Sequence, residues 1–65
     1  METREIMHFL MDRGWSARDI EAALDGRVSV RSIYRWVRGE RAPKTRGTLD
    51  ALRALVEEVQ KGRTP

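Results

Sequence analysis

The sequence has few of the residues that cross-link a small fold or hold a metal ion. Among its 65 residues there is no cysteine, and His8 is the single histidine. Disulfides and thiolate metal sites are therefore excluded, and one imidazole cannot form a zinc site alone. Long apolar runs are also missing, since none approaches the roughly 20 residues of a membrane-spanning helix. We expect no metal ion, no cofactor and no membrane partner.

Catalytic combinations of residues are missing as well. The sequence shows no paired acid and base, no cluster of metal ligands and no glycine-rich phosphate loop. A chain of this length buries only about 60% of its unfolded surface, which leaves little room for a substrate pocket. The amino terminus lacks the charged and then apolar pattern of a signal peptide. We therefore expect a single cytoplasmic domain over residues 1–65 that is not an enzyme and has no evident small-molecule ligand.

Positive charge is concentrated in one part of the chain. Residues 1–26 carry three basic and six acidic side chains, residues 27–47 carry seven basic side chains against Glu40 alone, and residues 48–65 carry three of each. The middle segment therefore has a net charge of +6, which is typical of proteins that bind a polyanion. The alternative is a solvated helix face without a partner.

Four segments have apolar residues at the spacing of an amphipathic helix, and residues typical of helix ends bound them. The spacing predicts helices over about residues 2–13, 16–24, 29–38 and 48–61. Ser16, Ser29 and Thr48 are the predicted N-caps of the last three, and Gly39 the predicted end of the third. A turn at Gly26 joins the second helix to the third. The predicted fold class is all-α, a compact four-helix domain with a helix-turn-helix formed by the second and third helices.

The third predicted helix has two distinct faces. At about 100° per residue, Ile33 and Trp36 fall on one side of it, and Arg31, Arg35 and Arg38 fall on the other. The apolar face is suited to the core, and the opposite face presents three guanidinium groups. Guanidinium groups form paired hydrogen bonds with phosphate or guanine, so this helix is the candidate contact with the polyanion.

The central helices also follow a known pattern. It consists of Ser16 and Ile20 at the start of the second helix, Val28 and Ser29 at the start of the third, Ile33 within it, and the run Trp36-x-x-Gly39-x-x-x-Pro43. This pattern resembles the lambda-repressor-like helix-turn-helix family, which comprises small DNA-binding regulators of the Cro, CI and Xre types. The resemblance covers residues 3–60, nearly the whole chain.

Two features depart from the pattern of that family. The family has a small residue directly after the position of Ile20, where this chain has Glu21. The segment from Leu24 to Val28 is also about two residues longer than the usual tight turn. Either the second helix is extended or the turn is wider, which leaves the crossing angle of the two helices open.

The resemblance implies contact with double-stranded DNA, with the third helix in the major groove and its early residues at the base edges. The residues that it assigns to base readout are Ser29, Val30, Arg31, Tyr34 and Arg35. The two-faced helix independently selects Arg31 and Arg35, which could each pair with O6 and N7 of a guanine. The role of Val30 stays open, because helical geometry places it at the edge of the core whereas the family pattern lets it contact a thymine methyl group.

Phosphate contacts require positive side chains or free backbone donors beside the helix that reads the bases. The amino end of the second helix offers such donors, and the residues around the third helix offer the charge. The predicted phosphate contacts are Ser16, Ala17, Arg27, Arg38, Arg41, Lys44, Thr45 and Arg46.

Members of this family usually act as dimers on inverted repeats, so we expect a homodimer. The predicted dimer face is the apolar stripe of the fourth helix, which consists of Leu52, Leu55, Val56 and Val59. The same stripe is also needed to cover the core.

The leading hypothesis is a sequence-specific transcriptional regulator, in particular a Cro-like repressor that acts in the bacterial nucleoid or in a phage-infected host cell. The same surface would serve the DNA-recognition module of a phage terminase, excisionase or transposase system. A different hypothesis is a helical protein-interaction adaptor whose basic face meets an acidic partner. Sequence-specific binding of duplex DNA separates the first two hypotheses from the third.

Overall fold

Four helices account for the regular structure of the chain. The computed structural model describes residues 1–65, and its helices are α1 (Thr3–Asp12), α2 (Ala17–Ala23), α3 (Val30–Val37) and α4 (Arg46–Gln60). It contains no strand, and none of its helices is long and apolar enough to cross a membrane. The predicted all-α fold class is confirmed, and α2 packs against α3 as in a helix-turn-helix.

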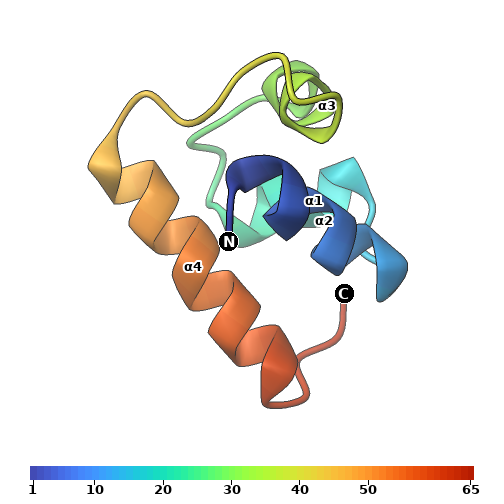
Figure 1. Ribbon diagram of the computed structural model, residues 1–65. Helices are drawn as coiled ribbons and strands as arrows, with labels where there is room; N and C mark the ends of the chain where they lie inside the picture. The colour runs from blue at the N-terminus through green and yellow to red at the C-terminus, as the bar shows by residue number, and fades with distance from the viewer.

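The helices enclose one apolar core. α1 contacts both α3 and α4, and in Figure 1 α3 lies across one end of the molecule while α4 runs along its side. Thirteen buried apolar residues form the core, among them Ile6 from α1, Ile33 from α3 and Leu52 from α4. Full burial of a side chain of this size contributes about 1.5–3 kcal/mol. The core therefore fixes the position of α3 from its inner face.

The fourth helix begins earlier than predicted. Its N-cap is Thr45, whose hydroxyl accepts a hydrogen bond of 3.4 Å from the backbone N–H of Thr48. The prediction of Thr48 as the cap was wrong, because both threonines can cap a helix and the earlier one adds a further turn of backbone hydrogen bonds. Gly47 consequently lies in the first turn of α4, and the connection from α3 is shorter than predicted.

The turn between α2 and α3 is wide, as one of the two alternatives predicts. α2 ends at Ala23 without extension, and residues 24–29 connect it to α3. The backbone N–H groups of Asp25 and Gly26 donate to carbonyl oxygens in the last turn of α2 at 3.1 and 3.2 Å, the paired bonds of a Schellman motif. Both residues are left-handed, with φ of 56° and 72°. The predicted turn at Gly26 is confirmed, and the left-handed conformation of Asp25 was not predicted.

The apolar stripe of α4 faces the core. Its four residues have exposed fractions between 0% and 8% and belong to the single core cluster. The stripe consists of Leu52, Leu55, Val56 and Val59. Because these side chains are already covered within one copy of the chain, they are not free to form the predicted dimer face. The structure corrects this assignment, and a homodimer would need another surface.

Candidate nucleic-acid interface

Local hydrogen bonds set both ends of α3. At its amino end, the Ser29 hydroxyl accepts a hydrogen bond of 3.2 Å from the backbone N–H of Ser32, as predicted for an N-cap. At its carboxyl end, Gly39 has a φ of 75°, and the N–H groups of Gly39 and Glu40 each donate at 3.0 Å to carbonyl oxygens of the last turn. This is a second Schellman motif, and it allows the chain to leave α3 sharply.

A carboxylate from α2 closes the amino end of α3. The Glu21 Oε2 accepts a hydrogen bond of 3.2 Å from the backbone N–H of Val30. This N–H is one of the four that an α-helix leaves unpaired at its start. The position at which the resembled family has a small residue therefore carries a direct link between the two helices of the motif.

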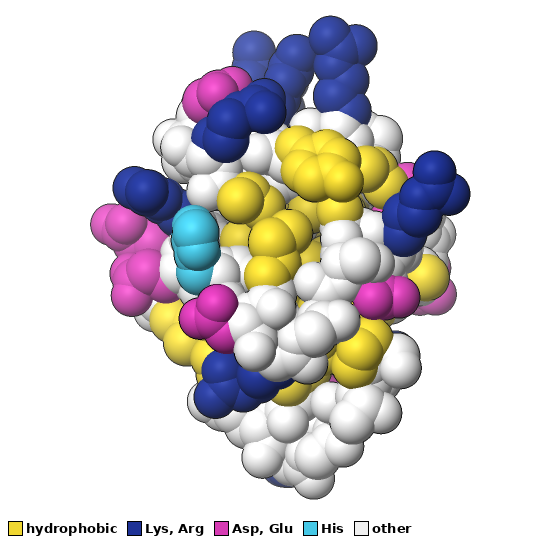
Figure 2. Space-filling model, turned by 90° about the vertical axis from the view of Figure 1, so that its right-hand side faces the viewer, with side chains coloured by type: hydrophobic (Ala, Val, Ile, Leu, Met, Phe, Trp, Pro, Cys, Tyr) yellow, Lys and Arg dark blue, Asp and Glu magenta, His cyan; other side chains and the backbone are white.

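The outward face of α3, together with its C-cap Arg38, carries three exposed side chains. Arg31, Tyr34 and Arg38 are exposed, Tyr34 to 51%, and Arg35 is half-buried at the side of this face. Figure 2 shows Lys and Arg side chains gathered at the end of the molecule where α3 lies. A partner that approaches α3 from outside would meet these four side chains first.

Two of the predicted base readers are engaged within the chain. Val30 is half-buried and packs against the core. This agrees with the position at the edge of the core that helical geometry predicts, and it leaves less of the side chain free to contact a thymine methyl group. Ser29 is exposed, but its hydroxyl accepts from the Ser32 N–H and donates to the Ser32 Oγ at 3.3 Å. The other predicted readers, Arg31, Tyr34 and Arg35, make no side-chain hydrogen bond within the chain.

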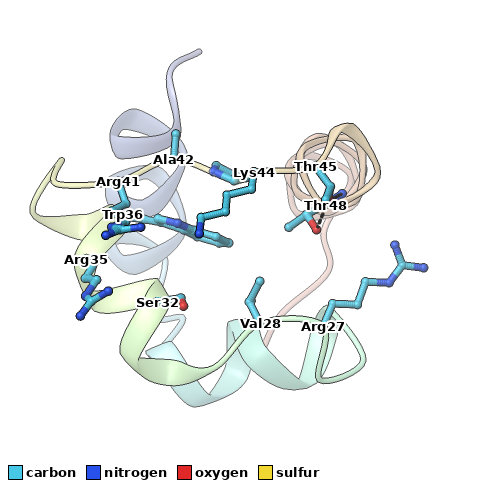
Figure 3. Close-up of a pocket in the computed structure, with 11 residues that line it drawn as sticks. Arg27, Val28, Ser32, Arg35, Trp36, Arg41, Ala42, Lys44, Thr45 and Thr48 are labelled. Atoms are coloured by element: carbon cyan, nitrogen blue, oxygen red, sulfur yellow. Dashed lines mark hydrogen bonds between the residues drawn. The ribbon is translucent and has the colours of Figure 1, made fainter.

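A groove lies between α3 and the start of α4, and we term it the α3–α4 groove. Its lining residues are Arg27, Val28, Ser32, Arg35, Trp36, Arg41, Ala42, Pro43, Lys44, Thr45 and Thr48. Figure 3 shows Arg35, Trp36 and Arg41 on one side of the groove and Arg27 and Val28 on the other. Lys44 projects from the loop after α3 into the space between them. The groove thus draws on every segment from the turn before α3 to the first turns of α4.

Positive charge dominates this groove. Arg27, Arg35, Arg41 and Lys44 line it, whereas no aspartate or glutamate does. The two ion pairs of the structure lie elsewhere, so no cation of the groove is paired with a carboxylate. A concave surface lined by charges of one sign concentrates the field, which attracts anions.

Arg27 places its positive charge close to the amino end of α4. Its Nη1 lies 4.0 Å from the position that a Cβ would occupy at Gly47, in the first turn of α4. The amino end of a helix carries a partial positive charge and unpaired N–H groups. An anion between Arg27 and α4 would therefore be attracted by both.

Ser32 is a groove residue that sequence reasoning missed. It lies three residues before Arg35, so a helix places the two side chains on neighbouring positions of one face. This spacing is the signal in the sequence for Ser32, which is uncharged and lies outside the residues that the family pattern assigns to DNA contact. Trp36 forms part of the groove and is only 3% exposed, in agreement with its prediction as a core residue.

Ser16, at the amino end of α2, does not have free donors for an anion. The backbone N–H and the hydroxyl of Ser16 both donate to the Asp19 carboxylate at 2.8 Å, and Ala17 is only 4% exposed. The backbone hydrogen bond from Ser16, followed by the bond from its hydroxyl, lowers the pKa of Asp19. The prediction of Ser16 as a phosphate contact is therefore corrected, because the Asp19 carboxylate occupies both of its donors, whereas Ala17 stays a predicted contact through its backbone N–H.

The remaining predicted phosphate contacts fall into two groups. The groove brings together Arg27, Arg41, Lys44 and Thr45. Arg38 lies outside it and donates from Nε to the Glu40 Oε2 at 2.7 Å. Arg46 is exposed as the first residue of α4 and does not line the groove.

The groove offers an anion four cations and three hydroxyl groups. Its hydroxyl groups come from a serine and two threonines, and no histidine or carboxylate lines it. The chain has no group of three or more side chains that could together hold a metal ion. Comparisons with protein-family models, with curated protein sequences and with solved structures found no match to this chain.

Proposed function

We propose that this chain is a sequence-specific double-stranded DNA-binding transcriptional regulator that places α3 in the major groove. The observation that carries the proposal is the α3–α4 groove, whose four cations lack acidic partners and lie beside the exposed face of α3. A DNA duplex offers phosphates to such cations and base edges to the helix next to them. The resemblance to helix-turn-helix regulators of the Cro, CI and Xre types supports the same function.

The side chains divide into two kinds of contact. Arg31 and Arg35 read bases, since a guanidinium can bond to O6 and N7 of one guanine and discriminate against other bases by about 1–3 kcal/mol. Arg27, Arg41 and Lys44 bind phosphates and fix the register without reading the sequence. If these three phosphate contacts are made by each copy, the logarithm of affinity falls with the logarithm of salt concentration at a slope of about −3.

Within this class we infer a Cro-like repressor that occupies an operator in the cytoplasm. A helix of eight residues reaches few base pairs, so two copies on an inverted repeat, about one helical turn apart, supply the specificity. The two copies meet through a surface other than the buried stripe of α4.

Selection of bound duplexes from a random pool, followed by sequencing, tests the proposal. We expect enrichment of a consensus with two-fold symmetry, in which guanines occupy positions that Arg31→Ala or Arg35→Ala relaxes. A consensus without symmetry would retain DNA recognition and contradict the dimer. Binding without any enrichment would contradict the proposed function and favour the adaptor.

A reporter assay separates the repressor from a DNA-recognition module of a packaging or recombination system. The consensus is placed between a promoter and a reporter gene, and the chain is expressed in the same cell. We expect reduced reporter output with the consensus and unchanged output with a scrambled site. Tight binding of the consensus without a change in reporter output would contradict the repressor and favour the module.

A further inference from the structure

A second basic surface adjoins the α3–α4 groove. It is a hollow between the start of α1, the end of α3 and the first half of α4, and we term it the α1–α4 hollow. Its charged lining residues are Glu2, Arg4, Arg38, Glu40, Arg41 and Arg53. Four cations therefore face two acids in this hollow.

Each of the two acidic side chains already has a favourable electrostatic interaction within the chain. Glu40 is paired with Arg38 at 2.7 Å. Glu2 is the N-cap of α1, so its carboxylate lies at the positive end of that helix. Arg4, Arg41 and Arg53 form no ion pair, and they supply the charge that the hollow offers to a partner.

The groove and the hollow are adjacent, because they share two lining residues. Arg41 and Ala42 line both of them, so the loop after α3 is a ridge between two basic depressions. Arg4 is held against this ridge, because its Cδ lies 3.2 Å from the position of a Cβ at Gly39. A polyanion that occupies the groove and crosses the ridge at Arg41 next meets Arg4 and Arg53.

The fold brings these arginines together from separate parts of the sequence. Arg4 belongs to the acidic segment 1–26 and Arg53 to the balanced segment 48–65, and neither is part of the basic segment of the sequence. The Cα atoms extend over 28 Å along the longest axis of the molecule, which equals about eight base pairs at the roughly 3.4 Å spacing of phosphates along a strand. A longer duplex therefore extends past the residues that line the groove.

We infer that the α1–α4 hollow binds the phosphate backbone of DNA that flanks the site read by α3, through Arg4 and Arg53. The inference rests on the proposed function and extends it to DNA outside the recognised bases. It predicts that the chain binds a site embedded in longer DNA more tightly than the same site on a minimal duplex, with no preference for the flanking sequence. Electrostatic contacts with phosphate have this sequence-independent character.

The test compares Arg53→Gln with wild type on duplexes of two kinds. One kind carries only the selected site, and the other carries the site with an extension of about ten base pairs, one helical turn, on either side. At about 50 mM salt we expect Arg53→Gln to weaken binding of an extended duplex about tenfold and to reduce its salt slope by about one. Binding of the minimal duplex should be unchanged.

Lys61→Gln is the matched control. Lys61 is exposed at the other end of α4, it lines neither depression, and its replacement removes the same charge. We expect it to leave the difference between the minimal and extended duplexes intact. The double variant Arg4→Gln with Arg53→Gln should lower the salt slope by nearly two on the extended duplex, and thermal unfolding checks that it is folded.

The outcomes distinguish a failure of the flanking contact from a failure of the proposed function. Equal losses on minimal and extended duplexes, or no loss on either, would overturn the flanking contact while the groove still binds DNA. Weakened binding of polyglutamate by Arg53→Gln, with unchanged binding of extended DNA, would also overturn it and assign the hollow to an acidic protein. A wild-type chain that binds no duplex would overturn the proposed function and this extension together.

Discussion

Glu21 and Val30 connect the two helices of the motif through one hydrogen bond, in which a side chain of α2 accepts from the first backbone N–H of α3 at 3.2 Å. This bond acts as an additional N-cap for α3, beside that of Ser29. Because the donor and the acceptor come from different helices, the bond constrains the angle between them as well as the end of one. It links the stability of the fold to the presentation of the helix proposed to read DNA.

We expect Glu21→Ala to lower the free energy of unfolding by about 1 kcal/mol, as measured by urea denaturation, because the Val30 N–H loses its acceptor. Glu21→Gln keeps an acceptor oxygen and should lose less. On DNA, the alanine variant should bind the selected site less tightly with an unchanged salt slope, since Glu21 contacts no phosphate. An alanine variant as stable as wild type would show that the bond does not stabilise the fold.

Arg35 and Lys44 should respond differently to truncation. Arg35→Ala is expected to cost about 1–3 kcal/mol on the selected site and to relax the preference at one base position. Lys44→Ala should weaken selected and random duplexes to a similar degree and reduce the salt slope by about one. Titrations of both duplexes at several salt concentrations measure these effects. Equal losses for Arg35→Ala on selected and random DNA would contradict its assignment to base readout.

Asp25 has an unfavourable backbone conformation and an unfavourable charge for its position at the carboxyl end of α2. Its φ of 56° suits asparagine or glycine better, and its negative charge lies at the negative end of the helix dipole. We expect Asp25→Asn to raise the free energy of unfolding by about 0.3–1 kcal/mol. Gly26→Ala, at a φ of 72°, should instead lower it by about 1–2 kcal/mol. If Asp25→Asn lowered the stability in urea, the aspartate would have a favourable contact that outweighs the dipole.

Asp19 should make the stability depend on pH in the acid range. Its pKa is lower in the folded chain than in the unfolded chain, chiefly because the Ser16 N–H donates to the carboxylate. The unfolded chain therefore binds the proton more readily, and the stabilisation is fully present above the ordinary pKa of aspartate and is lost as pH falls through the lowered value. The melting temperatures of wild type and Asp19→Asn should converge as pH falls over this range. A constant difference would contradict the lowered pKa.

The parts of the fold that depend on neighbouring residues could be predicted from the sequence. Ser16, Ser29 and Gly39 act as caps because each cap bonds to residues within one helical turn. The start of α4 was mispredicted because Thr45 and Thr48 are equally good caps in isolation. Their order was decided by the additional backbone bonds that the longer helix forms.

Contacts between residues that lie far apart in the sequence could not be predicted from it. Glu21 departs from the family pattern in the sequence itself, but its bond to Val30 depends on how α2 and α3 cross. Likewise, the charge pattern identified Arg27 and Lys44, which lie inside the basic segment, and missed Arg4 and Arg53, which reach the same surface from other helices. The prediction that the apolar stripe of α4 forms a dimer face was wrong because periodicity alone does not identify what covers a stripe. A stripe that packs on the core and one that meets a partner have the same spacing.

The position of Trp36 gives the groove an optical signal of its own. The indole is part of the wall of the α3–α4 groove, while the second tryptophan, Trp15, lies beside the carboxyl-terminal residues and has a buried Nε1 without a hydrogen-bond partner. Trp15→Phe removes that unpaired donor and leaves Trp36 as the single indole of the chain. Fluorescence of this variant would then follow occupancy of the groove directly, without a label on the protein or on its partner.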